Sequence, residues 1–330
     1  MKRALIMLLC ALMTVSMFAG CTPNNEQGET TDPTEEKMYE EGTVYYVGPT
    51  RHYKSLTELF KLLQKDKTKK TIYVDEGVYD IFQEYKDAGV KSPPDTVTSA
   101  DYFQYNVFLP INTNLIGIGN VQLRFAPSAD EITYGESLTW APLNVLGECY
   151  IENIEIYCKN GRYAIHDDSH NDYQDSTHYY KNVRAIYELG DYKNGQQLGR
   201  NNTIGNGMAQ GATFVFEDCL FKFIGGGNHS AFYTHEIGST NPEKAPTLTF
   251  RNCKFQSSAD NNRTIRLQNL ATADLHIITT IENCEIDGGI YLTIYKDTSA
   301  QHFDVTLINS GNPRVTIDKP TENRYPIKVQ

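Results

Sequence analysis

Four segments of the chain repeat one short pattern, and this repeat constrains the fold more than any other feature. Each segment has an apolar strand, a charged residue, Asn or Asp, then Cys or Ile, and a second short strand. The segments are YIENIEIY (150–157), FVFEDCLF (214–221), LTFRNCKF (248–255) and TTIENCEI (279–286). Units this short cannot bury their own apolar side, so the pattern predicts coils that stack on one another as a solenoid.

The residues at the centre of the repeat are typical of a tight corner between two strands. Asn tolerates the unusual backbone angles of such a corner, and its amide can bond to the Asn of the next coil. The aligned corner residues are Asn153, Asp218, Asn252 and Asn283. Three cysteines follow in register, and we expect them to fill the interior as free thiols: Cys219, Cys253 and Cys284. A sparse, odd set of cysteines in the mature chain is not a disulfide framework.

The N-terminus has the pattern of a secretion signal. Lys2 and Arg3 precede a short apolar run that ends at Phe18-Ala19-Gly20-Cys21, which is too short for a spanning helix. The ending resembles the bacterial lipobox, although Phe18 departs from the usual Leu. This implies that residues 1–21 are a lipoprotein signal and that Cys21 is lipidated; an ordinary signal peptide is the alternative. Residues 22–41 are Pro/Asn/Glu/Thr-rich and predict a flexible tether.

The rest of the chain, residues 42–330, predicts one domain outside the cytoplasm, lipid-anchored to the bacterial membrane or cell surface. Membrane contact is expected through the lipid only, because no later stretch is long and apolar enough to cross a bilayer. The formal net charge of -11 argues against nucleic acid as a partner, since phosphates would be repelled. We expect a monomer whose partner is a polysaccharide or oligosaccharide.

The corner Asn ladder and the Asn-Cys rhythm resemble the right-handed parallel β-helix of the pectate-lyase superfamily. Residues 53–80 agree with this resemblance. Ser55 and Glu58 form a capping box, and a helical apolar face follows that could plug the open end of the solenoid: Leu56, Leu59, Phe60 and Leu63. The resemblance covers residues 43 to roughly 315 and specifies the fold better than the activity. It implies an all-β, single-stranded parallel β-helix with an N-terminal capping helix and a glycan groove on the first parallel sheet.

The strand order of the resembling family places four segments on that first sheet: 162–168, 230–236, 263–269 and 290–296. Period-2 alternation then points four side chains inward: Ile165, Phe232, Ile265 and Leu292. The outward row is His166, Tyr233, Arg266 and Thr293, and the next outward row is Asp168, His235, Gln268 and Tyr295. Long loop inserts near 82–108 and 169–212 would flank this face. The second is rich in Tyr and adds His170 and Tyr173 as sugar contacts.

Two chemistries could use this face. Elimination on a uronic-acid polymer needs a base and a neutralised carboxylate. Arg266, His166 or His235 could be the base or could neutralise the carboxylate, and the resemblance points to Arg266 as the base. Calcium is the one candidate cofactor, although none is certain, with oxygen ligands from Asp167, Asp168 and Asp172. Hydrolysis would instead use the carboxylates of Asp168 and Glu236 on neighbouring coils. The family's full calcium signature and its Trp motif are absent from the sequence.

The remaining alternative is a non-catalytic glycan-binding or adhesin-like surface protein, because fold alone does not decide function. Strict alternation would bury Asp167, which is costly without partners, so we expect the strand to end at His166 and the carboxylate to turn outward. The predicted catalytic residues are His166, Asp168, His235, Glu236 and Arg266. The predicted sugar contacts are Tyr233, Gln268, Tyr295, His170 and Tyr173.

Overall fold

The computed structural model describes residues 42–96, 102–169, 171–199, 201–237, 242–258, 263–269, 276–294, 302–317 and 327–330. The predicted signal, Cys21 and the tether therefore lie outside the described residues, as do His170 and Tyr295. No helix in the described ranges combines the length and the hydropathy that a membrane crossing needs.

Most of the described chain forms two parallel sheets, here called sheet A and sheet B. Sheet A contains β1 (Thr43–Val47), β2 (Lys70–Val74), β3 (Gly77–Asp80), β4 (Thr113–Phe125), β6 (Cys149–Lys159), β8 (Thr177–Lys181), β9 (Arg184–Glu188), β13 (Thr213–Glu217), β14 (Leu220–Ile224), β16 (Thr247–Arg251), β17 (Lys254–Ser257), β19 (His276–Glu282), β20 (Glu285–Ile286), β22 (His302–Ile308) and β24 (Ile327–Val329). Sheet B contains β5 (Leu143–Val145), β7 (Ile165–Asp168), β12 (Ile204–Met208), β15 (Phe232–Ile237), β18 (Ile265–Asn269), β21 (Gly289–Ile294) and β23 (Arg314–Ile317).

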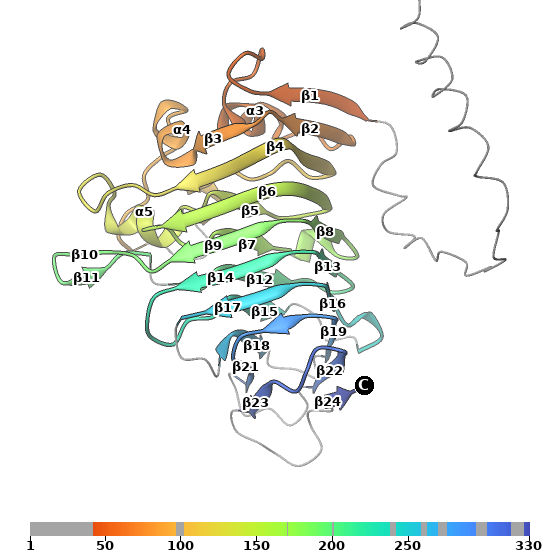
Figure 1. The fold of residues 1–330 in the computed structure, drawn as a ribbon. Coiled ribbons are helices and arrows are strands. Elements are labelled where there is room, and N and C mark those ends of the chain that lie inside the picture. The colour runs from red at the N-terminus through yellow and green to blue at the C-terminus, as the bar shows by residue number, and fades with distance from the viewer. Residues whose placement is uncertain are drawn as a thin grey trace, which may run out of the picture. The chain divides into compact units, whose positions relative to one another are not determined.

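The remaining elements are short. The helices are α3 (Leu56–Leu63), α4 (Ile81–Asp87) and α5 (Tyr134–Thr139), and the 3-10 turns are η1 (Tyr102–Tyr105), η2 (Asn171–Tyr173) and η3 (Pro242–Lys244). An antiparallel hairpin of β10 (Tyr192–Lys193) and β11 (Gln196–Gln197) projects from the stack (Figure 1).

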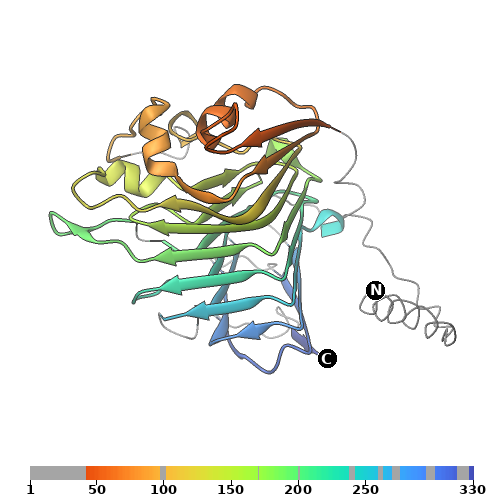
Figure 2. The same ribbon diagram turned by 45° about the horizontal axis from the view of Figure 1, so that its top comes forward.

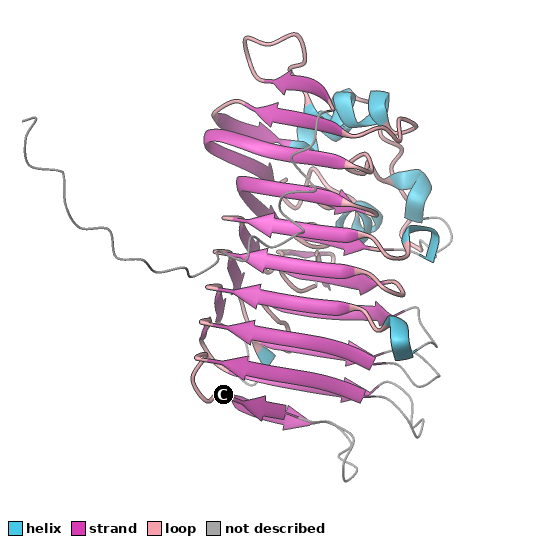
Figure 3. Ribbon diagram, turned by 90° about the vertical axis from the view of Figure 1, so that its right-hand side faces the viewer, coloured by secondary structure: helices cyan, strands magenta, loops and turns pink. Residues whose placement is uncertain are grey.

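The two sheets wind into a parallel β-helix, which confirms the predicted fold class (Figures 1 and 2). Sheet A consists of two rows of strands that meet at a corner. One row includes β9, β14 and β17, and the other includes β8, β13 and β16. The long strands β4 and β6 pass through the corner from one row to the other. One coil follows β13, the corner at Asp218, β14, a loop and β15, and the next follows β16, β17 and β18. Each strand pairs in parallel with its counterpart one coil away, and Figure 3 shows the strands piled as successive rungs.

The predicted corner residues all adopt the left-handed backbone conformation. The φ angles of Asn153, Asp218, Asn252 and Asn283 are 57°, 55°, 53° and 52°. Asn182 and Asn309 share this conformation and mark two corners that the sequence analysis did not include. The side chain of Asn182 donates from Nδ2 to Oδ1 of Asn153 at 2.7 Å, which is the expected amide contact between coils.

The interior is packed with apolar side chains, as the repeat predicted. The five described cysteines are buried free thiols, and Cys219, Cys253 and Cys284 follow successive corners. Aromatic rings stack from coil to coil on the inner side of sheet A: Phe216 lies 4.7 Å from Tyr180 and 5.2 Å from Phe250 between ring centroids. At the N-terminal end, the capping helix is α3. Its buried residues include Leu56, Leu59, Phe60 and Leu63, and Ser55 accepts a hydrogen bond from the Glu58 amide.

Residues 169–212 are not an insert, and that prediction was wrong. They contain β8, β9 and β12, which form a complete additional coil with Asn182 at its corner. Val183 occupies the interior position that Cys holds in later coils, so this repeat lacks the cysteine that marks the others. The β10–β11 hairpin interrupts this coil between β9 and β12. The extra coil places β12 between β7 and β15. Residues of β7 and β15 that were predicted to be neighbours are therefore separated by one strand.

Candidate functional site

The outer face of sheet B carries a continuous column of side chains in register. In order along the stack it runs Asn144, His166, Gly205, Tyr233, Arg266 and Tyr291. The predicted outward direction of His166, Tyr233 and Arg266 follows from this register. Two positions shift: Gly205 separates His166 from Tyr233, and Thr293 pairs with Gln268 rather than with Arg266. The predicted inward residues Ile165, Phe232, Ile265 and Leu292 are all buried in the core.

His166 leaves the sheet on its outer side but is completely buried, so the prediction of an accessible surface residue was wrong. The hydroxyl of Tyr102 lies 2.7 Å from its Nδ1, and the ring of Tyr163 stacks on its ring at 5.2 Å. Tyr102 belongs to η1, within the 82–108 insert, which therefore covers this end of the face. The imidazole Nε2 lies 3.8 Å from Oδ2 of Asp168, whose side chain is 21% exposed.

These groups form one compact assembly, which we call the histidine cluster: Tyr102, Arg162, Tyr163, His166 and Asp168. The Arg162 guanidinium lies over two aromatic rings, 4.4 Å from the centroid of Tyr102 and 5.4 Å from that of Tyr163. Burial raises the pKa of both tyrosine hydroxyls, and the positive charge of Arg162 opposes that shift. Both hydroxyls therefore stay protonated at neutral pH.

Gly205 connects the histidine cluster to the rest of the column. A Cβ built on Gly205 would lie 2.4 Å from the ring of Tyr163, so only glycine lets that ring lie over β12. The Tyr163 hydroxyl is then close enough for the charges of Asp168 and Arg266 to act on its pKa. Sequence reasoning missed Tyr102, Arg162 and Tyr163. The one signal was the pair of glycines at 205 and 207 within a single strand, which is typical of a close approach.

Beyond Gly205 the face becomes an arginine–tyrosine ladder, made of Tyr233, Arg263, Arg266 and Tyr291. Arg266 lies 5.0 Å over the Tyr233 ring and Arg263 lies 4.2 Å over the Tyr291 ring. All four side chains are partly exposed. Burial raises the pKa of Tyr233 to about 12, with a smaller opposing effect from its hydrogen bond to Gln268.

The predicted carboxylate pair of Asp168 and Glu236 is not on neighbouring coils. Both residues pair with Gly207, from opposite sides, so β12 lies between them. At about 4.8 Å per strand their backbones are about 9.6 Å apart. A bulge in β15 also leaves His235 without a register partner on β12, so strict alternation ends there. The side chains of His235 and Glu236 lie outside the described part of the chain.

Asp167 points into the core, and the prediction that its carboxylate turns outward was wrong. Its Oδ1 lies 2.9 Å from His178 Nδ1, and the Tyr180 hydroxyl donates to Oδ2 at 2.5 Å. With Cys149 and Ser176 these residues form a fully enclosed core polar cluster, because β8 supplies partners that the sequence analysis had placed in a loop. Burial, followed by the nearby Asp167 carboxylate, raises the pKa of the Cys149 thiol. It is therefore not a reactive thiolate.

The hydrogen bonds of the core polar cluster run through both ring nitrogens of His178. The Ser176 hydroxyl donates to the carbonyl oxygen of Tyr173 at 2.7 Å, so its lone pairs can accept from His178 Nε2 at 2.9 Å. His178 Nδ1 lies 3.0 Å from Asp167 Oδ2 at the same time. His178 therefore links Ser176 to Asp167 in one buried chain of hydrogen bonds.

The predicted calcium ligands do not converge. Asp167 faces the core while Asp168 faces outward on the same strand, and Asp172 belongs to η2. Within the described ranges, no three His, Cys, Asp or Glu side chains are grouped so that they could hold a metal ion. Tyr173, predicted as a sugar contact, packs partly buried against Tyr102, Phe108 and Leu146.

No family model matches the chain, and no curated protein matches it. Among solved structures, the chain is similar to the pectin methylesterase from Aspergillus niger. In its penultimately deglycosylated form the identity is 12% and the TM-score 0.40, over 87% of this chain and 89% of that one. The deglycosylated form gives 10% identity and a TM-score of 0.38 over the same shares. The parallel β-helix itself is established by the strand pairing described above.

Proposed function

We propose that this protein binds an acidic polysaccharide along the outer face of sheet B. The observation that carries the proposal is the arginine–tyrosine ladder. Tyrosine rings stack on the faces of sugar rings, and guanidinium groups form bidentate hydrogen bonds with carboxylates. A polymer lying parallel to the solenoid axis would meet Tyr233, Arg266 and Tyr291 in turn, one coil apart.

The charge distribution supports an acidic rather than a neutral polymer at this face. The protein as a whole carries a formal net charge of -11, yet the ladder presents two arginines side by side with aromatic rings. A local cationic strip on an acidic protein favours an anionic ligand at that strip and disfavours one elsewhere. In this proposal the protein is secreted and held at the bacterial surface by lipid on Cys21, where such polymers occur.

Cleavage of the bound polymer is a second candidate function, and one observation favours it. The charges of Asp168 and Arg266 both act on the pKa of the buried Tyr163, so a carboxylate and a guanidinium lie near one hydroxyl. Elimination and hydrolysis both need a base beside a group that stabilises charge. The lyase or hydrolase alternative would use Asp168 and Arg266, with Tyr163 between them.

The test is a panel of polygalacturonate, alginate and hyaluronan with cellulose and mannan oligomers as neutral controls. Binding is measured by calorimetry at two salt concentrations. Cleavage is followed at 235 nm and by reducing-sugar release, with and without calcium. We expect tight, salt-sensitive binding to at least one acidic polymer, and about tenfold weaker binding for Arg266→Met, which is about 1.4 kcal/mol. Tyr233→Ala should weaken binding similarly.

Lys254→Met is the matched control, because Lys254 is an exposed cation on sheet A. It should bind like the unmodified protein. Equal affinity for neutral and acidic polymers, or an Arg266→Met variant that folds and binds normally, would contradict the proposed site. Binding without release of product on either readout would exclude the cleavage alternative and leave the binding function in place.

A further inference from the structure

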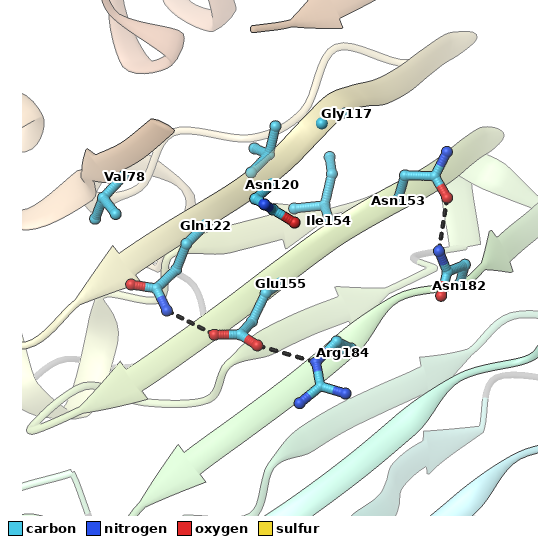
Figure 4. Close-up of a pocket in the computed structure, with 11 residues that line it drawn as sticks. Val78, Gly117, Asn120, Gln122, Asn153, Ile154, Glu155, Asn182 and Arg184 are labelled. Carbon is cyan, nitrogen blue, oxygen red and sulfur yellow. Dashed lines mark hydrogen bonds and ion pairs between the residues drawn. The ribbon is translucent and has the colours of Figure 1, made fainter. Parts of the chain in front are cut away.

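A pocket of about 440 Å³ opens on the outer face of sheet A, where its two rows of strands meet (Figure 4). Four successive coils line it, through β3, β4, β6 and the corner at Asn182 with the start of β9. The polar lining residues are Asn120, Gln122, Asn153, Glu155, Asn182 and Arg184. We call it the corner pocket. Its volume lies within the roughly 300–1,000 Å³ typical of small-ligand sites.

The corner pocket exists because one corner of the solenoid is longer than the others. Ile116 pairs with Glu152 and Val121 with Ile154, so residues 117–120 of β4 lie opposite Asn153 alone. Gly119 has a φ of 76°, and a Cβ on Gly117 would lie 2.2 Å from the carbonyl oxygen of Asn153. The two glycines therefore let the extra residues bulge while the coils remain in contact.

The side chains of the corner pocket form a chain of hydrogen bonds that neutralises its one acid. Gln122 Nε2 donates to Oε1 of Glu155 at 2.6 Å, and Arg184 Nε donates to Oε2 at 3.0 Å. The terminal nitrogens of the Arg184 guanidinium point away from Glu155, as Figure 4 shows. The pocket thus offers amide donors next to amide oxygens, with the Arg184 guanidinium at its edge and no aromatic residue in its lining.

We infer that the corner pocket is a second binding site that takes a neutral saccharide, independent of the acidic-polymer site on sheet B. Paired donors and acceptors at fixed positions match the hydroxyl groups of a sugar. An anionic sugar is disfavoured, because Glu155 already uses the charge of Arg184 and would repel a second carboxylate. Without aromatic stacking, the dissociation constant should be on the order of 1 mM.

The test uses the full mature chain and three neutral probes, cellotriose, mannotriose and maltotriose, with trigalacturonate as the anionic probe. Saturation-transfer NMR titrations give a dissociation constant for each. We expect at least one neutral trisaccharide to bind. Its dissociation constant should rise at least about fivefold in Arg184→Met and in Asn120→Ala. Arg184 is 53% exposed, so its replacement should leave the fold intact, which circular dichroism checks.

Lys254→Met and Tyr233→Ala are the two controls. Lys254 occupies the same column of sheet A as Arg184, two coils away, and pairs with Glu285 outside the pocket. Neither control should change binding of the neutral probe. Failure of all three neutral probes to bind, binding that Arg184→Met leaves unchanged, or loss of binding in Tyr233→Ala alone would each overturn the inference. Preference for trigalacturonate with dependence on Arg184 would overturn the assignment to a neutral ligand.

Discussion

Replacing Asp167 by Asn should destabilise the protein strongly, although the substitution changes neither size nor shape. Asp167 is completely buried, and its carboxylate accepts hydrogen bonds from His178 and Tyr180. The amide would remove the acidic partner of His178 and would turn one acceptor into a donor. Removing one partner of a buried acid–base pair costs about 3–5 kcal/mol, far more than a surface change.

Asp168→Asn is the matched control, because it makes the same chemical change one residue later on the opposite face of β7. Asp168 is partly exposed but lies beside buried His166 and Arg162, so its replacement should cost about 1 kcal/mol, clearly less than that of Asp167. The measurement is urea unfolding followed by circular dichroism. At a slope of about 3 kcal/mol per M, Asp167→Asn should lower the midpoint by about 1 M or more.

A double-variant cycle tests the cause. If Asp167 and His178 stabilise each other as an acid–base pair, Asp167→Asn with His178→Gln should cost clearly less than the two single changes added together. Additive losses would contradict the acid–base pair. An Asp168→Asn variant less stable than Asp167→Asn would refute the assignment of faces on β7, and with it the register of sheet B.

Three further predictions concern other parts of the solenoid. Asn182→Ala should lower the free energy of unfolding by about 1–2 kcal/mol in urea, since it forces a Cβ residue without a local hydrogen bond into a φ of 51° and removes the bond to Asn153; Asn182→Gly should cost less. Ser55→Ala should cost about 1 kcal/mol in thermal unfolding, because it removes the N-cap of α3 and the hydroxyl that donates to Glu84, and Ser55→Thr, which keeps a hydroxyl, should restore most of it. Burial alone would raise the pKa of Glu136, but its bonds, first of all to Lys86, lower it below 4.5. The stability that this carboxylate contributes should therefore be present above pH 4.5 and lost as the pH falls through the lowered pKa; Lys86→Met should flatten that part of the pH profile.

The fold could be predicted from the sequence because its determinants are local and repeated. The corner pattern at Asn252 and Asn283 fixes a left-handed residue, two flanking strands and an interior thiol within eight residues. The capping helix was predictable for the same reason, since Ser55 and the apolar spacing after it lie close together in the chain. Stacking then follows, because coils that cannot bury their own apolar side have no other partner.

The missing coil shows where this local reasoning fails. The segment around Asn182 has the corner but carries Val183 in place of Cys, and its first strand contains His178 and two tyrosines. These polar aromatic residues suggested a loop. His178 and Tyr180 are interior residues whose polar atoms are satisfied by Ser176 and Asp167, while Tyr179 donates to Glu217. The partners Asp167 and Glu217 come from other strands. The same long-range pairing explains why Asp167 faces inward.

For the candidate site, the sequence predicted the direction in which the side chains leave sheet B but not whether solvent can reach them. Alternation along β7 correctly gives the side from which His166 leaves the sheet. It contains no information about what covers that side, and the cover comes from Tyr102, more than sixty residues earlier. Tyr233 and Arg266 were correctly placed as neighbours because β15 and β18 are consecutive on sheet B, with no unrecognised strand between them.

The corners at Asp218, Asn252 and Asn283 share one backbone conformation, and this has a consequence for how such a chain can change. The strands β13, β16 and β19 keep unbroken register although the connecting segments between them differ in length and content. In these coils the extra residues are absorbed in the connections that border sheet B, so an insertion there leaves the stacked wall untouched. The rim of the glycan face can therefore be remodelled by lengthening or trimming connections, while the scaffold that holds the arginines and tyrosines in line stays the same.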